Sequence, residues 1–255
     1  MMQQGHNYLL TLSYVGSRYH GSQIQQNANT VQSVFQQALQ TVLGYLPAIK
    51  CCSRTDSGVH AKAFCISFVT DFSQNCDKLV LALNANLPRD VRVLHAREVP
   101  LDFHARYSAR GKRYEYHICN SRVMDPFLLE RAHQFSPHLD EEALSRVAQL
   151  FLGTHDFSAF CSGRSDVEDK CRTVTEASVR REGDVVIFSF AADGFLYNMV
   201  RIMTGALLQV ARGKLTAEDI TAYLNGRPRD NRLITAPACG LYLMEVFYDF
   251  EHGTL

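Results

Sequence analysis

The chain has 255 residues with 26 basic and 26 acidic side chains, so its formal net charge is zero. A hydrophobic fraction of 46% and a charged fraction of 20% are those of a soluble globular protein. The neutral balance argues mildly against a nucleic-acid binder, although acidic surface elsewhere can offset a basic groove. The first residues lack the basic and apolar segments of a signal peptide, and the eight cysteines show no CxxC spacing. We therefore expect a cytoplasmic protein with reduced thiols and no membrane segment.

The first part of the chain predicts a strand, a helix, and then further strands around a second helix. Apolar residues at helical spacing predict a helix over 31–43, which Asn29 or Thr30 caps and Gly44 ends. Before it lie a strand and a polar loop, and after it lie a polar turn, a strand, a helix and a strand: residues 7–14, 16–23, 52–61, 64–68, 77–86 and 91–99. The order is β-α-β-β-α-β, which is the ferredoxin-like plan.

A similar order of elements recurs from about Phe103. The predicted strands and helices are, in order, a strand at 113–118, a helix at 141–152, a strand at 185–190, a helix at 195–210 and a strand at 241–247. A polar segment of mixed charge from Ser162 to Arg172 predicts a mobile loop. We therefore expect an α+β protein with two halves, residues 1–102 and 103–255, and a cleft between them.

One polar turn interrupts the apolar pattern of the first half. Arg54, Thr55 and Asp56 stand side by side just before a strand that alternates apolar and small residues. Such a turn projects a carboxylate from a rigid scaffold, which is a common place for chemistry. An Asp that merely caps a turn is the alternative, and by itself the more common case.

The predicted helix at 195–210 is apolar nearly all round, which indicates a buried helix. Arg201 is then a cation in a largely apolar setting, and it needs a carboxylate partner. Asp56 is one candidate and Asp193, just upstream, is its rival. A purely structural salt bridge is the alternative to a functional pair.

Two groups of basic residues are candidates for contact with phosphates. Arg106, Arg110, Lys112 and Arg113 fall within eight residues, and residues 226–232 form a second basic loop. Two ordinary solvated surfaces explain the same pattern equally well.

Several of these segments resemble motifs of the TruA family of tRNA pseudouridine synthases. Arg54–Ala61 is similar to RTDxGVHA, and Phe195–Arg201 is similar to FLxxMVR. Further similar pieces are LNAxLP at 83–88, FHAR at 103–106, KxYxY at 112–116 and APAxGL at 236–241. Each piece alone is weak, but the ordered set spans nearly the whole chain.

The resemblance implies the pseudouridine synthase fold, two ferredoxin-like halves whose antiparallel sheets flank a central active-site cleft. It implies a tRNA substrate, isomerised at uridine 38, 39 and/or 40 of the anticodon arm, and a homodimer. No metal or cofactor is expected, because the histidines show no ligand spacing. In the family the Asp matching Asp56 is catalytic, and the Arg matching Arg201 pairs with it.

Other roles carry over by motif. Arg54 matches the Arg that takes part in flipping the nucleotide, and Tyr114 matches the Tyr that stacks on the uracil and is a candidate for proton transfer. Leu241 or Leu243 closes the other face of the base. The remaining substrate-binding candidates are Arg18 and Gln23 in the first loop, and Lys112 and Arg113 beside Tyr114.

The reaction itself needs one carboxylate, because it consumes no water and so does not require the pair that a glycosidase uses. That carboxylate either adds to C1′ or takes the C2′ proton, and the sequence leaves both mechanisms open. An arginine partner favours its ionised form and fixes its direction.

Two departures from the family pattern limit this transfer. The first loop commonly reads YDGxxxxGWQxQ, whereas Val15 and Ser22 stand here in place of its Asp and Trp. Ser53 precedes Arg54 where the family usually has Gly. Because the first loop is expected to touch RNA, these changes bear on which uridines are modified.

Two other classes of protein remain as alternatives. A noncatalytic RNA-binding module of the same fold would keep the basic patches but need neither Asp56 nor Arg201. A Cys/His hydrolase would use Cys52 or Cys161, but no nucleophile motif supports it.

Overall fold

A computed structural model describes residues 5–163 and 167–250. Their contacts divide the chain into two compact units, one within Met1–Arg110 and Leu243–Leu255, the other Gly111–Tyr242. Phe103 belongs to the first unit, where its ring lies 5.1 Å from that of Tyr248. The halves expected from the sequence were 1–102 and 103–255. The contacts instead place residues 103–110 and 243–255 with the first unit.

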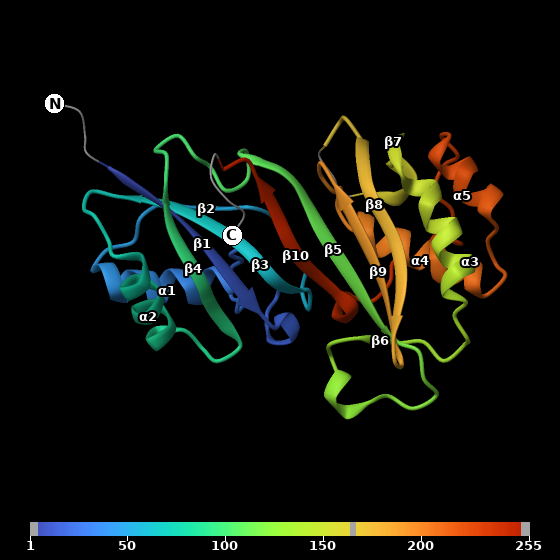
Figure 1. Cartoon of the computed structure of the whole chain (residues 1–255), viewed down its shortest axis with the longest axis horizontal. Helices are drawn as coiled ribbons and strands as arrows, with labels where there is room; N and C mark the ends of the chain where they lie inside the picture. Colours follow the sequence, from blue (N-terminus) through green and yellow to red (C-terminus); the bar gives the residue numbers. More distant parts are fainter. Residues whose placement is uncertain (1–4, 164–166, 251–255) are drawn as a thin grey trace. The chain divides into compact units, whose positions relative to one another are not determined.

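The first unit has the expected ferredoxin-like order. Its elements are β1 (His6–Tyr14), α1 (Val31–Leu43), β2 (Ile49–Cys51), β3 (His60–Thr70), α2 (Cys76–Asn86) and β4 (Val91–Val99), followed much later by most of β10 (Leu241–Tyr248). The antiparallel strands run β4-β1-β3, with β2 also on β3, and α1 packs beside α2 (Figure 1). Tyr8 and Phe68 face each other in the β1–β3 register and are fully buried.

Helix α1 begins and ends where the sequence predicts. The Thr30 hydroxyl accepts the backbone N–H of Ser33, and the Ser33 hydroxyl accepts the N–H of Thr30, which forms a capping box. Gly44 ends the helix in the left-handed conformation, with φ of 81°. Both ends are therefore fixed by local chemistry, and the polar loop before α1 meets a rigid helix start.

The second unit also alternates strands and helices but has additional short strands and a further helix. Its elements are β5 (Ala109–Cys119), β6 (His133–Gln134), α3 (Glu141–Ala148), β7 (Gly153–Asp156), β8 (Cys171–Glu182), β9 (Val185–Ala192), α4 (Met199–Ala211) and α5 (Ala217–Leu224), and β5 begins two residues before the unit does. The strand order is β5-β9-β8-β7, with β6 on β5. Helix α3 packs on β8 and on α4, as Figure 1 shows in yellow and orange. A cluster of buried aromatic rings fills the core between them: Phe151, Phe157, Phe160, Phe190 and Tyr223.

Three expectations about elements need correction. Helix α4 begins at Met199 and not at Phe195, because Asn198 is left-handed, with φ of 62°. The helix predicted over 141–152 ends at Ala148 and continues as a 3₁₀ turn. Strand β8 and helix α5 were not predicted. Of the loop predicted from Ser162 to Arg172, residues 164–166 lie outside the described residues.

No helix in residues 5–163 and 167–250 is long and apolar enough to cross a membrane.

Candidate active site

The Arg-Thr-Asp turn leads into β3, as the sequence predicts. Arg54 is exposed, Thr55 is buried and Asp56 is half-buried, which is the alternation of an extended segment. The chain then turns at Ser57 and Gly58, and the N–H of Val59 donates to the carbonyl of Asp56 at 3.2 Å. Gly58 has a φ of 79°, which a side chain would strain. The Asp56 carboxylate therefore stands at the tip of a tight turn beside a core strand.

Thr55 is held through each of its polar atoms. Its N–H donates to the Ser22 hydroxyl at 2.8 Å, and its carbonyl accepts the Ser22 N–H at 3.0 Å. Its own hydroxyl lies 2.8 Å from that of Tyr14, the last residue of β1. The residue directly before Asp56 is thus fixed by both the first loop and the sheet.

The first loop also holds the residues after Asp56. The Tyr19 carbonyl accepts hydrogen bonds from the Ser57 hydroxyl and the Gly58 N–H, each at 3.3 Å. The Gly16 N–H donates to Nδ1 of His60 at 3.0 Å, which places the proton of the neutral ring on Nε2. His60 is almost fully buried, so this contact is shielded from water.

Arg201 lies on the first turn of α4 and is half-buried. Its Nε donates to the Ala236 carbonyl and its Nη1 to the Asn198 side chain, both at 2.8 Å. The Ala236 N–H donates in return to the Arg201 carbonyl at 3.0 Å. A Cβ at Gly205 would collide with the Ile234 carbonyl, so α4 and the 234–236 segment pack backbone to backbone. The guanidinium is therefore oriented by contacts within its own unit.

Asp193, the rival candidate for pairing with Arg201, directly follows β9. It is exposed, and its carboxylate accepts the N–H of Thr173 at 3.1 Å, which ties it to β8. Asp193 thus has a partner of its own on β8, and the pairing of Arg201 with Asp56 stays a prediction.

The predicted base-contacting residues lie on strands. Tyr114 on β5 is buried, and its ring meets that of Phe195 edge to face at 5.1 Å. Leu241 and Leu243 point to the same side of β10, two residues apart, and are 7% and 0% exposed. Leu241 belongs to the second unit and Leu243 to the first.

The predicted substrate-binding residues of the first loop and of β5 differ in their exposure and in their carboxylate neighbours. Arg18 is largely exposed and lies 3.4 Å from the Asp90 carboxylate, while Gln23 is exposed. Arg113 lies 3.6 Å from Glu176, and Lys112 beside it is half-buried.

The basic loop at 226–232 is an internal ion-pair network. Arg227 and Arg232 both donate to Asp219, at 2.7 and 3.1 Å, and Arg232 also donates to Asp230 at 3.0 Å. Arg229 donates to the Leu233 carbonyl at 2.9 Å. The hydrogen bond from Arg232 lowers the pKa of Asp230 to about 2. The arginines of this loop are therefore committed to residues of their own unit, which weakens the case for a phosphate site.

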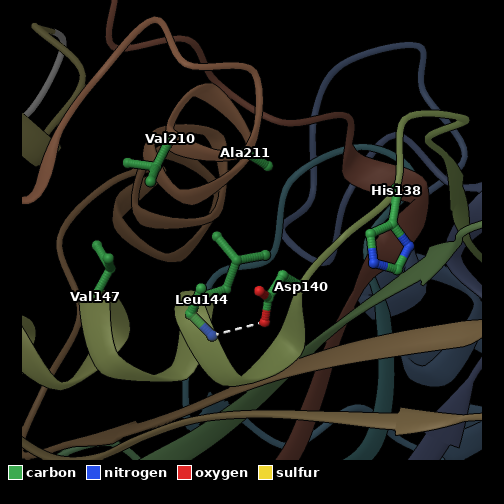
Figure 2. A pocket seen from close by; sticks show the side chains of 7 residues that line it. His138, Asp140, Leu144, Val147, Val210 and Ala211 are labelled. Atoms are coloured by element: carbon green, nitrogen blue, oxygen red, sulfur yellow. Dashed lines mark hydrogen bonds between the residues drawn. The ribbon is translucent and has the colours of Figure 1, made fainter.

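A small pocket lies between α3 and α4 (Figure 2). Leu144 and Val147 of α3 face Val210 and Ala211 of α4 there. Its carboxylate, Asp140, accepts the Ala143 N–H at 2.9 Å and so caps α3. None of the predicted site residues lines this pocket.

Within residues 5–163 and 167–250, no cluster of three His, Cys, Asp or Glu side chains is arranged to hold a metal ion.

Sequence reasoning missed the residues that hold the site. Ser22, Tyr14 and His60 fix the Asp56 turn, and Asn198 and Ala236 orient Arg201. Periodicity and charge carry no signal for such contacts, because most of them join segments that are far apart in sequence, and the one local contact, from Arg201 to Asn198, depends on the left-handed backbone of Asn198.

These features agree with comparisons to known proteins. A family model described as tRNA pseudouridine synthase matches residues 11–108 and 147–249. A tRNA pseudouridine synthase A of Acetivibrio thermocellus is 45% identical over 242 residues, covering 95% of this chain and 99% of that protein. One of Halalkalibacterium halodurans is 43% identical over 233 residues, covering 91% and 89%. The chain belongs to the tRNA pseudouridine synthase family, of the TruA type that its motifs resemble, and it has that family's α+β fold.

The ion-pair network predicts a pH-dependent contribution to stability. Asp230 has a pKa of about 2 in the folded protein against an ordinary value of 3.8. Its contribution is therefore complete above about pH 4 and is lost as pH falls toward 2. Asp230→Asn should lower the melting temperature at pH 7 by at most about 2–4 °C, because both partners are about one-third exposed and water screens the pair.

Thermal unfolding of both proteins between pH 7 and pH 2 measures this difference. The difference in melting temperature between wild type and Asp230→Asn should become smaller below pH 4. Asp184→Asn, which alters an exposed carboxylate of the same unit, should show no such trend. A gap that stays constant down to pH 2 contradicts the assignment.

Proposed function

We propose that this protein isomerises uridine to pseudouridine in tRNA, at position 38, 39 and/or 40 of the anticodon arm, with Asp56 as the essential carboxylate. Family membership supports the reaction class. The observation that carries the assignment of Asp56 is the turn itself, in which a half-buried carboxylate follows a residue held through every polar atom. A carboxylate that only capped a turn would not need this degree of support.

The reaction breaks the bond from N1 to C1′, turns the uracil and forms a bond from C5 to C1′. C5 then loses its hydrogen as a proton and N1 gains one, so no atoms enter or leave overall. Asp56 either adds to C1′ and is later displaced by C5, or removes the C2′ proton and returns it. In both mechanisms Asp56 acts in its ionised form. A rigid turn keeps this oxygen near the reacting carbon and so lowers the entropic cost of the step.

Other residues complete the proposed site. Arg54, exposed next to Thr55, is assigned to extrusion of the target nucleotide. Tyr114 is assigned to stacking on the uracil, with Leu241 or Leu243 on the other face. Arg201 is assigned to pairing with Asp56.

The tRNA backbone needs cationic contacts beyond the target base. We assign these to Arg18 of the first loop and to Lys112 and Arg113 of β5, and we assign a neutral hydrogen-bonding contact to Gln23 of the first loop. Assembly as a homodimer in the cytoplasm is proposed on the family resemblance alone.

A cysteine hydrolase finds no support. Cys52 is fully buried, and its sulfur accepts the N–H of Cys65 at 3.2 Å. Burial raises the pKa of the neighbouring Cys51 to about 12, so its thiolate is scarce at neutral pH. Cys161 is also buried. The remaining alternative, a noncatalytic RNA-binding module, predicts binding without turnover.

Release of tritium from tRNA labelled at uridine C5 distinguishes an enzyme from a binder. Isomerisation expels that hydrogen, whereas binding leaves it in place. Wild type should release it, and Asp56→Asn should reduce the rate by about 10²–10⁴-fold or more while keeping tRNA affinity. Asp102→Asn, which alters an exposed carboxylate of the same unit, should stay within about twofold of wild type.

Binding of tRNA without release by wild type would favour the binding module. Release by Asp56→Asn at the wild-type rate would remove Asp56 from the mechanism and leave the enzyme class intact.

The proposed pairing of Asp56 with Arg201 is tested by a double-mutant cycle. Arg201→Ala alone should be destabilising whatever its partner, since it removes the bonds to Ala236 and Asn198. The double variant should lose less free energy of unfolding than the sum of the losses in Arg201→Ala and Asp56→Asn, by about 0.5–3 kcal/mol.

Chemical denaturation of the four proteins gives the coupling energy. Asp193→Asn combined with Arg201→Ala is the control and should be additive, because Thr173 holds Asp193. Additivity for the Asp56 cycle as well would refute the pairing.

The proposed phosphate contacts are tested by the salt dependence of tRNA binding. Lys112→Gln should weaken binding and reduce the slope of log affinity against log salt by about 1. Lys78→Gln, on the exposed face of α2, should leave the slope unchanged. Equal slopes for wild type and Lys112→Gln would show that Lys112 contacts no phosphate.

A further inference from the structure

Ser22 is a buried polar residue that the proposed reaction does not use. Its side chain is in the first loop, 2% exposed, at the position where the family motif commonly has Trp. Its hydroxyl accepts the N–H of Thr55 at 2.8 Å, and its own N–H donates to the Thr55 carbonyl at 3.0 Å. Ser22 therefore forms hydrogen bonds with both backbone polar groups of Thr55, the residue that precedes Asp56.

Ser22 and its neighbour Gly21 also form hydrogen bonds with the start of α1. The Ser22 carbonyl accepts the N–H of Gln32 at 3.0 Å, and the Gly21 carbonyl accepts the N–H of Val31 at 3.2 Å. Val31 is the first residue of the helix, whose capping box fixes the N-terminal turn. A rigid path thus runs from the helix start through Ser22 to the peptide between Thr55 and Asp56.

The first loop and the Asp56 turn are in close backbone contact at Gly21. A Cβ at Gly21 would lie 2.6 Å from the Thr55 carbonyl oxygen and 3.3 Å from the carbonyl carbon of Asp56. Gly21 also has a φ of 90°, which favours glycine. The loop backbone therefore lies directly against the Asp56 turn, and a small movement of either one displaces the other.

We propose that Ser22 is a positioning residue for the reaction, which sets the direction of the Asp56 carboxylate through its hydrogen bond to the Thr55 N–H. This inference rests on the proposed role of Asp56. Without the hydroxyl, the buried N–H of Thr55 has no acceptor there, and the peptide turns or shifts to find one. A displacement of about 1 Å costs a reaction of this kind on the order of 10²-fold in rate.

A simple stabilising role is the competing explanation, because any buried serine that accepts a backbone N–H contributes to folding. The same unit contains a matched case. Ser67 on β3 is fully buried, and its hydroxyl accepts the N–H of Ala105 at 3.1 Å. Ser67 bonds to the chain near Phe103, and no hydrogen bond joins it to the Asp56 turn. Ser67→Ala therefore removes an equivalent hydrogen bond without touching the turn.

The experiment compares wild type, Ser22→Ala, Ser22→Thr and Ser67→Ala in tritium release from C5-labelled tRNA, with kcat and KM determined separately and thermal unfolding measured in parallel. Ser22→Ala should lower kcat by about 10- to 100-fold with KM within about twofold. Ser67→Ala should lower the melting temperature to a similar degree with kcat near wild type. Ser22→Thr keeps the hydroxyl and should recover most of kcat. Ser22→Cys, of similar volume but a weak acceptor, should give an intermediate kcat and serves if the alanine variant does not fold.

A kcat for Ser22→Ala within twofold of wild type overturns the proposal. Equal losses of kcat in Ser22→Ala and Ser67→Ala overturn it too, since they indicate general destabilisation. Failure of the proposed function gives a different pattern: wild type releases no tritium, or Asp56→Asn remains as active as wild type.

Discussion

The hydrogen bonds around Thr55 are the constraint on which the proposed site depends. A carboxylate at the tip of a turn is useful only if the turn does not move, and a turn of this length cannot hold itself. Here Ser22, Tyr14 and the sheet hold it from outside. The Asp56 turn therefore belongs physically to the first loop and to β1 as much as to the strand that follows it, and the loop's packing restrains the geometry of the carboxylate.

Much of the fold follows from sequence because its signals are local. The helix at Val31–Leu43 and the strand at Val91–Val99 are set by periodicity and caps, and they were predicted to the residue. The start of α4 was not, because the left-handed Asn198 interrupts an apolar run that looks helical throughout. Strand β8 was missed because its face alternates weakly: Arg180, Arg181 and Glu182 are polar in succession, and each finds an ionic partner.

Charge is harder to interpret than periodicity, because a sequence does not show which cations are already paired. The loop at 226–232 has the composition of a phosphate site, yet Asp219 and Asp230 neutralise its arginines. Arg18 lies 3.4 Å from the Asp90 carboxylate but is largely exposed, so it stays a candidate for contact with RNA. The same limit applies to the proposed site: motifs name Asp56 and Arg201 as candidates, but no motif names the contacts of Ser22 and Asn198.

The first loop departs from the family motif at Ser22, yet Ser22 still forms hydrogen bonds with Thr55 beside Asp56. Its departure at Ser22 replaces a large aromatic residue with a small hydroxyl, which from sequence alone suggests a weakened site. In the structure the Ser22 hydroxyl reaches the Thr55 N–H and supplies an acceptor that Trp lacks. Because a buried N–H needs a partner, the departure is compatible with a firmly held Asp56. The support of the Asp56 turn is thus a property of this chain's own packing, which resemblance at the motif does not determine.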